Sequence, residues 1–119
     1  MLTKIKRELQ IIHLTVTNDA LADGRITRPE KKILSSFKEM IRDLNDILNV
    51  LAETHGIDPS PHDRDGYLRL LDELFQFLLS HLFEVAKDEE GNVETTAANL
   101  LEVIANKLDT LLNKLIKSY

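Results

Sequence analysis

Carboxylate side chains gather around two glycine-containing turns of this chain. They are Asp19, Asp23 and Glu30 in the first turn, and Asp88, Glu90 and Glu94 in the second. Hard divalent cations such as calcium and magnesium bind preferentially to oxygen ligands of this kind. The sequence therefore predicts these six residues as candidate ligands of a divalent cation, calcium or magnesium, with ligands shared between the two turns.

The same residues also fit the ordinary chemistry of helix ends. Thr27 followed three residues later by Glu30 is the capping-box pattern, in which two side chains satisfy free backbone N–H groups reciprocally. Pro29 suits a first helical turn, where its missing N–H costs nothing. Gly24 can adopt the left-handed conformation that commonly ends a helix. The cation site and the helix caps both stay open as interpretations at this point.

Other kinds of metal site fit the spacing less well. An EF-hand register places Leu21 at the third ligand position of the first turn, and Ala86 and Ala97 at the first and last ligand positions of the second, where oxygen ligands are required. A di-iron or di-manganese bundle needs Glu-x-x-His motifs, and the sequence contains none. The two histidines of the 55–62 segment could hold zinc, but solvated loop residues are the simpler interpretation.

The hydrophobic pattern predicts four helices and no strand. Apolar residues recur at spacings of three and four, and glycine and proline fall at the breaks or in the first turn after one. The expected helices cover residues 2–21, 28–53, 65–87 and 95–117. We therefore predict an all-α, antiparallel up-down-up-down four-helix bundle. This topology places both acidic turns at the same end, about 10 Å apart.

The two acidic turns also indicate an internal duplication. When Gly24 is laid on Gly91, aliphatic residues on both sides of the turn keep the same helical phase. The chain then divides into pseudo-repeats over about 2–54 and 65–118, connected by a 55–64 loop. We expect a single domain over residues 1–119, built from two copies of a helix–acidic turn–helix unit.

Composition narrows the classes of function. The 119 residues are 43% hydrophobic and 29% charged, which is ordinary for a folded domain. The net charge of −5 argues against nucleic acid as the partner, since phosphate binding needs a concentrated basic face. The absence of cysteine excludes disulfides and thiolate metal sites. No apolar run is long enough for direct membrane insertion, and we expect a cytoplasmic location.

An apolar surplus in the third expected helix predicts a binding face. Its hydrophobic residues cover more than half of the helix circumference, and such a helix must bury more than one side. The candidate partner-binding residues are Leu70, Leu74, Phe77, Leu79 and Phe83. The cover could be a second copy of the chain, a protein partner, or the neighbouring helices of the bundle.

The segment 20–30 resembles the hallmark of the TerB-like tellurite-resistance family, to which the N-terminal domain of a membrane-anchored J-domain co-chaperone is related. The family pattern is a helix running into Ala-x-Ala-Asp-Gly-x-aliphatic, then a polar pair and Glu, and segment 86–93 is similar to its second acidic turn. The chain departs from the family at Ala97, where the family has a helical Glu, and the 55–66 segment is unmatched. The resemblance implies an all-helical cytosolic module that binds divalent cations and works in stress-related or membrane-associated complexes, without enzymatic activity.

Two function hypotheses follow. The first is a TerB-like, non-enzymatic accessory protein whose acidic turns bind a divalent cation. The alternative is a metal-free adaptor or immunity-type protein that acts through the apolar face of the third helix, as a homo-oligomer. An enzyme is not expected, because the sequence has no glycine-rich phosphate loop and no nucleophile with a placed base.

Overall fold

The computed structural model describes residues 1–22, 24–56 and 58–118 of the chain. Four helices account for most of them: α1 (Leu2–Leu21), α2 (Arg28–His55), α3 (Pro61–Ala86) and α4 (Thr95–Ser118). The described residues contain no strand. The prediction of an all-α fold with four helices is therefore confirmed for this part of the chain.

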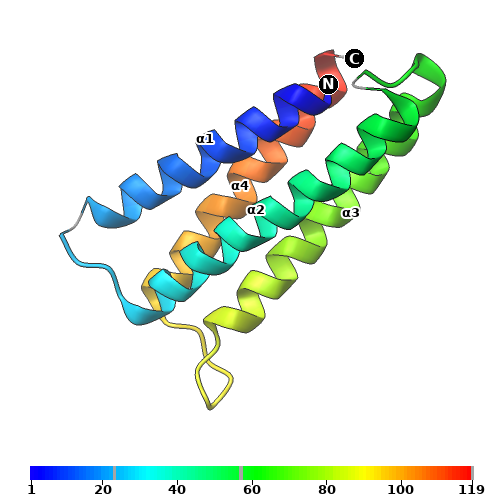
Figure 1. Ribbon diagram of the computed structural model, residues 1–119. Coiled ribbons are helices and arrows are strands. Elements are labelled where there is room, and N and C mark those ends of the chain that lie inside the picture. Colours follow the sequence, from blue (N-terminus) through cyan, green and yellow to red (C-terminus); the bar gives the residue numbers. More distant parts are fainter. Residues whose placement is uncertain (23, 57, 119) are drawn as a thin grey trace.

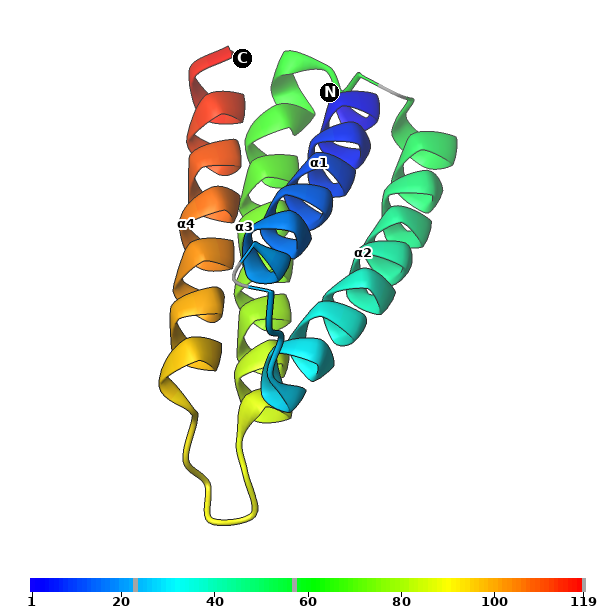
Figure 2. The same ribbon diagram turned by 90° about the vertical axis from the view of Figure 1, so that its left-hand side faces the viewer.

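The four helices pack side by side in an elongated molecule of 45 × 27 × 22 Å (Figure 1). The ends of α1 and α3 and the starts of α2 and α4 lie at one end of the molecule. Both α1 and α3 pack against α2 and α4, and α2 and α4 also contact each other across the middle. Helices α1 and α3 consequently occupy opposite corners (Figure 2).

The start of α2 forms the capping box that the sequence predicts. The Glu30 N–H donates to the Thr27 hydroxyl oxygen, and the Thr27 N–H donates to the Glu30 carboxylate. Pro29 lies in the first turn of the helix. The preceding Gly24 has a φ of 72°, in the left-handed region that glycine adopts without steric penalty. The capping box, the position of Pro29 and the left-handed conformation of Gly24 are therefore confirmed, whereas the C-cap of α1 is Ala22 and not Gly24.

Helix α3 begins earlier than the sequence pattern indicates. We expected a loop through residue 64 and a helix from Asp65, but α3 starts at Pro61. The proline ring fixes φ at a helical value and suits the first turn. Asp63 also lies in that first turn, where a negative charge interacts favourably with the helix dipole. Gly66 is therefore an interior helical residue, and the link between α2 and α3 is correspondingly short.

One hydrophobic core runs along the bundle. Its residues come from all four helices and recur at spacings of three and four. The largest side chains with almost no exposure are Phe37, Ile5, Leu9, Ile33, Ile41, Leu78, Leu82, Ile104, Leu108, Leu115 and Val16. None of the helices formed by the described residues is both long and apolar enough to cross a membrane.

Candidate functional site

Two of the predicted metal ligands border the same cavity at the α1–α2 turn. Asp19 lies in the last turn of α1, Glu30 lies in the first turn of α2, and both line a cavity of about 370 Å³. The other lining residues are Ala20, Arg25, Thr27, Thr96, Asn99, Leu100 and Val103. The site thus combines two carboxylates with hydroxyl and amide groups and one guanidinium. The predicted ligand Asp23 lies outside the described residues.

Glu30 is buried to an unusual degree for a charged residue. Its exposed fraction is only 8%, and one carboxylate oxygen accepts the Thr27 N–H at 3.1 Å. Burial of a carboxylate is costly unless hydrogen bonds compensate for the lost water. A carboxylate nevertheless has about four lone-pair sites on its two oxygens. The capping role of Glu30 therefore leaves acceptor capacity for a second partner.

Asp19 and Arg25 make the electrostatics of this cavity mixed. Asp19 is exposed, and its backbone carbonyl accepts the Ala22 N–H at 3.3 Å. Arg25 is also exposed and lines the same cavity. A guanidinium can satisfy carboxylates through strong charge-assisted hydrogen bonds. Arg25 and a metal ion would therefore compete for the same oxygens.

The second acidic turn is organised by Asp88. Its Oδ1 accepts the backbone N–H groups of Glu90 and Asn92, both at 2.9 Å. Its backbone carbonyl accepts the Gly91 N–H at 3.0 Å, and Gly91 has a φ of 85°. This arrangement is an Asx-type turn, in which the aspartate side chain bonds the backbone that follows it. The Asp88 carboxylate therefore already has a structural role.

The remaining two candidates of the second turn have different surroundings. Glu90 is exposed, and Glu94 accepts a hydrogen bond from the Thr96 hydroxyl. The Glu94 backbone carbonyl accepts the Ala98 N–H at 2.8 Å, as expected of a residue that precedes a helix. Asp88 lines a separate cavity together with residues that include Arg28 and Lys32 of α2.

The described part of the chain does not assemble a multidentate metal centre. No three histidine, aspartate or glutamate side chains within it lie close enough together to hold one ion. Of the six predicted ligands, Asp19 and Glu30 share one cavity, whereas Asp88 lines another. The cation site stays a prediction, centred on the α1–α2 turn.

The five predicted partner-binding residues of α3 divide into two groups. Leu74 and Leu79 are half-buried and pack against the core, and Leu70 is also half-buried. Phe77 and Phe83 are exposed by 67% and 47%. Because they are six residues apart, their side chains leave α3 about 120° from each other. The Lys87 ammonium lies 5.2 Å from the centre of the Phe83 ring, so Phe77 is the less covered aromatic.

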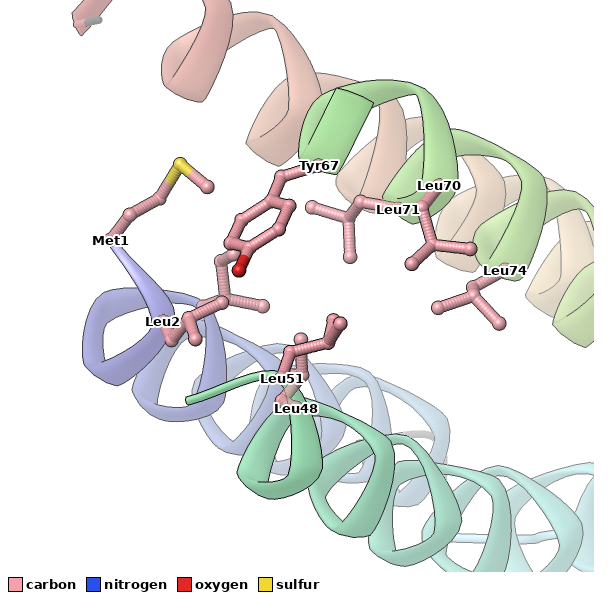
Figure 3. A pocket seen from close by; sticks show the side chains of 9 residues that line it. Met1, Leu2, Leu48, Leu51, Tyr67, Leu70, Leu71 and Leu74 are labelled. Carbon is pink, nitrogen blue, oxygen red and sulfur yellow. The ribbon is translucent and has the colours of Figure 1, made fainter. Parts of the chain in front are cut away.

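From helical spacing we infer that exposed apolar residues of α2 adjoin the side of α3 that carries Phe77. Leu70 and Leu74 share a cavity lining with Leu51 of α2 (Figure 3). Ile47 precedes Leu51 by one helical turn, on the same side of α2, and both Ile47 and Val50 are exposed. We call this surface the α2–α3 strip, and its residues are Ile47, Val50, Leu70, Leu74 and Phe77.

The cavity beside the strip is too small for a ligand. Its volume is about 10 Å³, which holds one water molecule at most. The Tyr67 hydroxyl is buried beside the lining and has no hydrogen-bond partner among the described residues. Burial raises the pKa of Tyr67, and the nearby Asp63 charge raises it further. Sequence reasoning missed Tyr67, although its position four residues before Leu71 places it on the core side of α3.

Comparison of the chain with protein-family models, curated proteins and solved structures gives no match. Its function is therefore argued from the residues at the α2–α3 strip and at the α1–α2 turn.

Proposed function

We propose that this chain is a non-enzymatic helical interaction module that binds a second copy of itself through the α2–α3 strip. The observation that carries the proposal is the exposure of Phe77, 67% of which is accessible, in line with Leu70 and Leu74. Aromatic side chains dominate the energetics of protein interfaces. Contiguous exposed apolar surfaces often mark the sites at which a protein binds another protein.

Burial of the strip would supply a useful driving force. Full burial of a large apolar side chain contributes about 1.5–3 kcal/mol, and a two-fold interface counts each contact twice. Phe77, Val50 and Ile47 are the exposed members of the strip. Association must also offset the loss of translational and rotational freedom. The strip therefore favours a weak to moderate, concentration-dependent dimer.

Polar side chains beside Phe77 support a second copy of the chain as the occupant. Glu73 lies four residues before Phe77, His81 lies four residues after it, and both are exposed. In an antiparallel two-fold pairing centred on Phe77, Glu73 of each copy faces His81 of the other. Such self-complementary placement is what an isologous interface requires, and complementary polar groups set its register.

Sedimentation velocity at increasing protein concentration tests this proposal. We expect the wild-type chain to dimerise, and Phe77→Asp to remain monomeric because it places a charge at the centre of the interface. Phe83→Asp is the matched control, since it makes the same change about 120° around α3 from Phe77 and should leave the dimer intact. A wild-type chain that stays monomeric throughout the range would refute the proposal.

The register can be tested by exchanging the two flanking residues. Glu73→His alone and His81→Glu alone each place like side chains opposite one another, and both should weaken the dimer. The double variant restores unlike pairs and should recover dimerisation. Recovery would support pairing centred on Phe77, whereas an additive loss in the double variant would contradict it.

Divalent-cation binding at the α1–α2 turn is the second candidate function. It is favoured by the shared cavity of Asp19 and Glu30, and it is the function that the TerB-like resemblance implies, together with a part in stress-related complexes. Calorimetric titration of chelator-treated protein with calcium and magnesium provides the test. Glu30→Gln is the informative variant, because glutamine keeps the capping box while removing the charge. Equal binding by wild type and Glu30→Gln would argue against this site.

We also infer an antiparallel up-down-up-down topology that arose by duplication. Both acidic turns contain a glycine in the left-handed region, Gly24 at 72° and Gly91 at 85°. Each turn connects a helix that ends to a helix that begins at the same end of the molecule. The duplication accounts for the repeated acidic residues without requiring both turns to bind a ligand. It therefore agrees with the structural role of Asp88.

A further inference from the structure

A polar cavity of about 150 Å³ lies in the seam between α1 and α2, away from the α2–α3 strip. Gln10 and His13 of α1 line it together with Lys38, Ile41, Arg42 and Asn45 of α2. The volume corresponds to about five water molecules. None of the described residues that line it is a carboxylate, although the whole chain carries a net charge of −5. The seam is thus a local concentration of donors and positive charge.

Asn45 lines this cavity and carries an unpaired hydrogen-bond acceptor. Its side-chain oxygen is buried and has no hydrogen-bond partner among the described residues. Leaving a buried acceptor unpaired is unfavourable, and native structures contain few of them. A turn of the Asn45 side chain toward the cavity would let a ligand donate a hydrogen bond to this oxygen and remove the penalty.

Lys38 and Arg42 supply unneutralised positive charge. They are four residues apart on α2, so the two cations are neighbours on one helical face, where like charges repel. Neither forms an ion pair with a carboxylate of the described residues. An anion between them would offset the repulsion and accept charge-assisted hydrogen bonds from both.

His13 is held in place at the edge of the same cavity. Its Nε2 lies 3.3 Å from the Leu34 carbonyl oxygen, so Nε2 carries the hydrogen and donates. Its ring packs against Phe37 with a centroid separation of 5.7 Å. The ring position is thus fixed from two directions, which gives the cavity one rigid wall.

We propose that this seam binds inorganic hydrogen phosphate. The negatively charged oxygens accept hydrogen bonds from Lys38 and Arg42. Once the Asn45 side chain turns toward the cavity, a P–OH group donates to its side-chain oxygen. Hydrogen phosphate offers both kinds of group at neutral pH, whereas sulfate has no donor. A phosphate monoester has a second pKa of about 6 and is mostly without its P–OH group at neutral pH. Asn45 thus selects inorganic phosphate over both.

An NMR titration of the full chain tests the assignment. Inorganic phosphate, sulfate and glycerol phosphate are added separately at constant ionic strength, and backbone amide shifts are followed. We expect saturable shifts along the α1–α2 seam with phosphate, and weaker binding of the other two anions. Lys38→Gln with Arg42→Gln should lower phosphate affinity by about tenfold or more. Lys31→Gln with Lys32→Gln removes the same charge from an exposed part of α2 and should leave the affinity unchanged.

A separate variant tests the role of Asn45 in phosphate selectivity. Asn45→Leu removes the unpaired buried oxygen, so it should raise the melting temperature without phosphate and abolish the preference for phosphate over sulfate. Three results would overturn the proposal: no saturable shift, equal binding of sulfate and phosphate by the wild type, or equal effects of the Lys38/Arg42 and Lys31/Lys32 double variants. None of these outcomes depends on whether the chain dimerises.

Discussion

Thr27 and Glu30 satisfy each other's backbone donors, with the Thr27 N–H 3.1 Å from the Glu30 carboxylate and the Glu30 N–H 3.3 Å from the Thr27 hydroxyl oxygen. This reciprocal pair fixes the start of α2 and places the buried Glu30 carboxylate beside the α1–α2 cavity. Glu30 thus both caps α2 and lines a candidate site. Separating the two roles requires variants that change one and keep the other.

Thr27→Ala should destabilise the chain by about 1 kcal/mol, the usual cost of losing an N-cap side chain. Glu30→Gln should cost less, because glutamine can still accept the Thr27 N–H. Urea unfolding followed by far-ultraviolet circular dichroism measures both. A larger loss from Glu30→Gln than from Thr27→Ala would mean that the carboxylate charge, rather than the cap, stabilises this turn.

Asp88→Ala should destabilise the α3–α4 turn by about 1 kcal/mol, since the Asp88 carboxylate accepts two backbone N–H groups. Asp88→Asn should be milder, because the amide oxygen can accept the same bonds. Thermal unfolding of the two variants provides the comparison. Equal destabilisation would show that the negative charge of Asp88 is required, and would draw attention back to a cation at this turn.

Tyr67→Phe should raise the free energy of unfolding by about 1 kcal/mol, because it removes a buried hydroxyl that lacks a partner. The effect should depend on pH. The pKa of Tyr67 is raised in the folded state above its ordinary value of 10.0, so the neutral phenol is favoured by folding. The free energy of unfolding of the wild type is therefore unaffected by this phenol below pH 10 and falls as the pH rises through the folded-state pKa.

Unfolding curves of wild type and Tyr67→Phe at neutral pH and above pH 10 check this prediction. The wild type should lose more stability over this interval than the variant, which has no phenol at this position. Parallel losses in the two proteins would indicate that Tyr67 ionises as readily in the folded chain as in the unfolded one.

Phe37→Ala should cost about 3–5 kcal/mol, the range for truncating a fully buried aromatic residue, since Phe37 has no exposed area. Phe77→Ala is the matched control: the same side chain is removed from an exposed position. At low protein concentration, where dimerisation does not contribute, its effect should be below about 0.5 kcal/mol. Chemical denaturation of both variants under identical conditions gives the comparison, and a similar cost at the two positions would contradict the assigned burial.

Helical periodicity and capping chemistry predicted much of the fold. The range of α1 and the capping box of α2 agree with the structure, because both depend on residues close together in the sequence. The start of α3 was missed because Gly66 and the prolines of the preceding segment resemble a loop. A proline at the start of a helix and a proline in a loop give the same local signal until the next turn is known.

The candidate sites were less predictable because they depend on which helix faces meet. The acidic residues near Gly91 stay predicted ligands, and the hydrogen bonds that tie the Asp88 carboxylate to its own backbone were not predicted from the sequence. The seam cavity joins His13 to Lys38 and Arg42, which are distant in the sequence and have no recognisable motif. Only the relative rotation of α1 and α2 brings these side chains together.

The placement of α1 and α3 at opposite corners of the bundle affects how the chain can tolerate sequence change. Residues of α1 and α3 both line the small cavity beside the α2–α3 strip, which also contacts Tyr67. Elsewhere, α1 and α3 pack against α2 and α4 and not against each other. Substitutions without shared partners usually combine additively, within about 0.5 kcal/mol. Positions of α1 and α3 that contact no common residue can therefore diverge independently, while core positions of the two helices are coupled through the residues of α2 and α4 that they share.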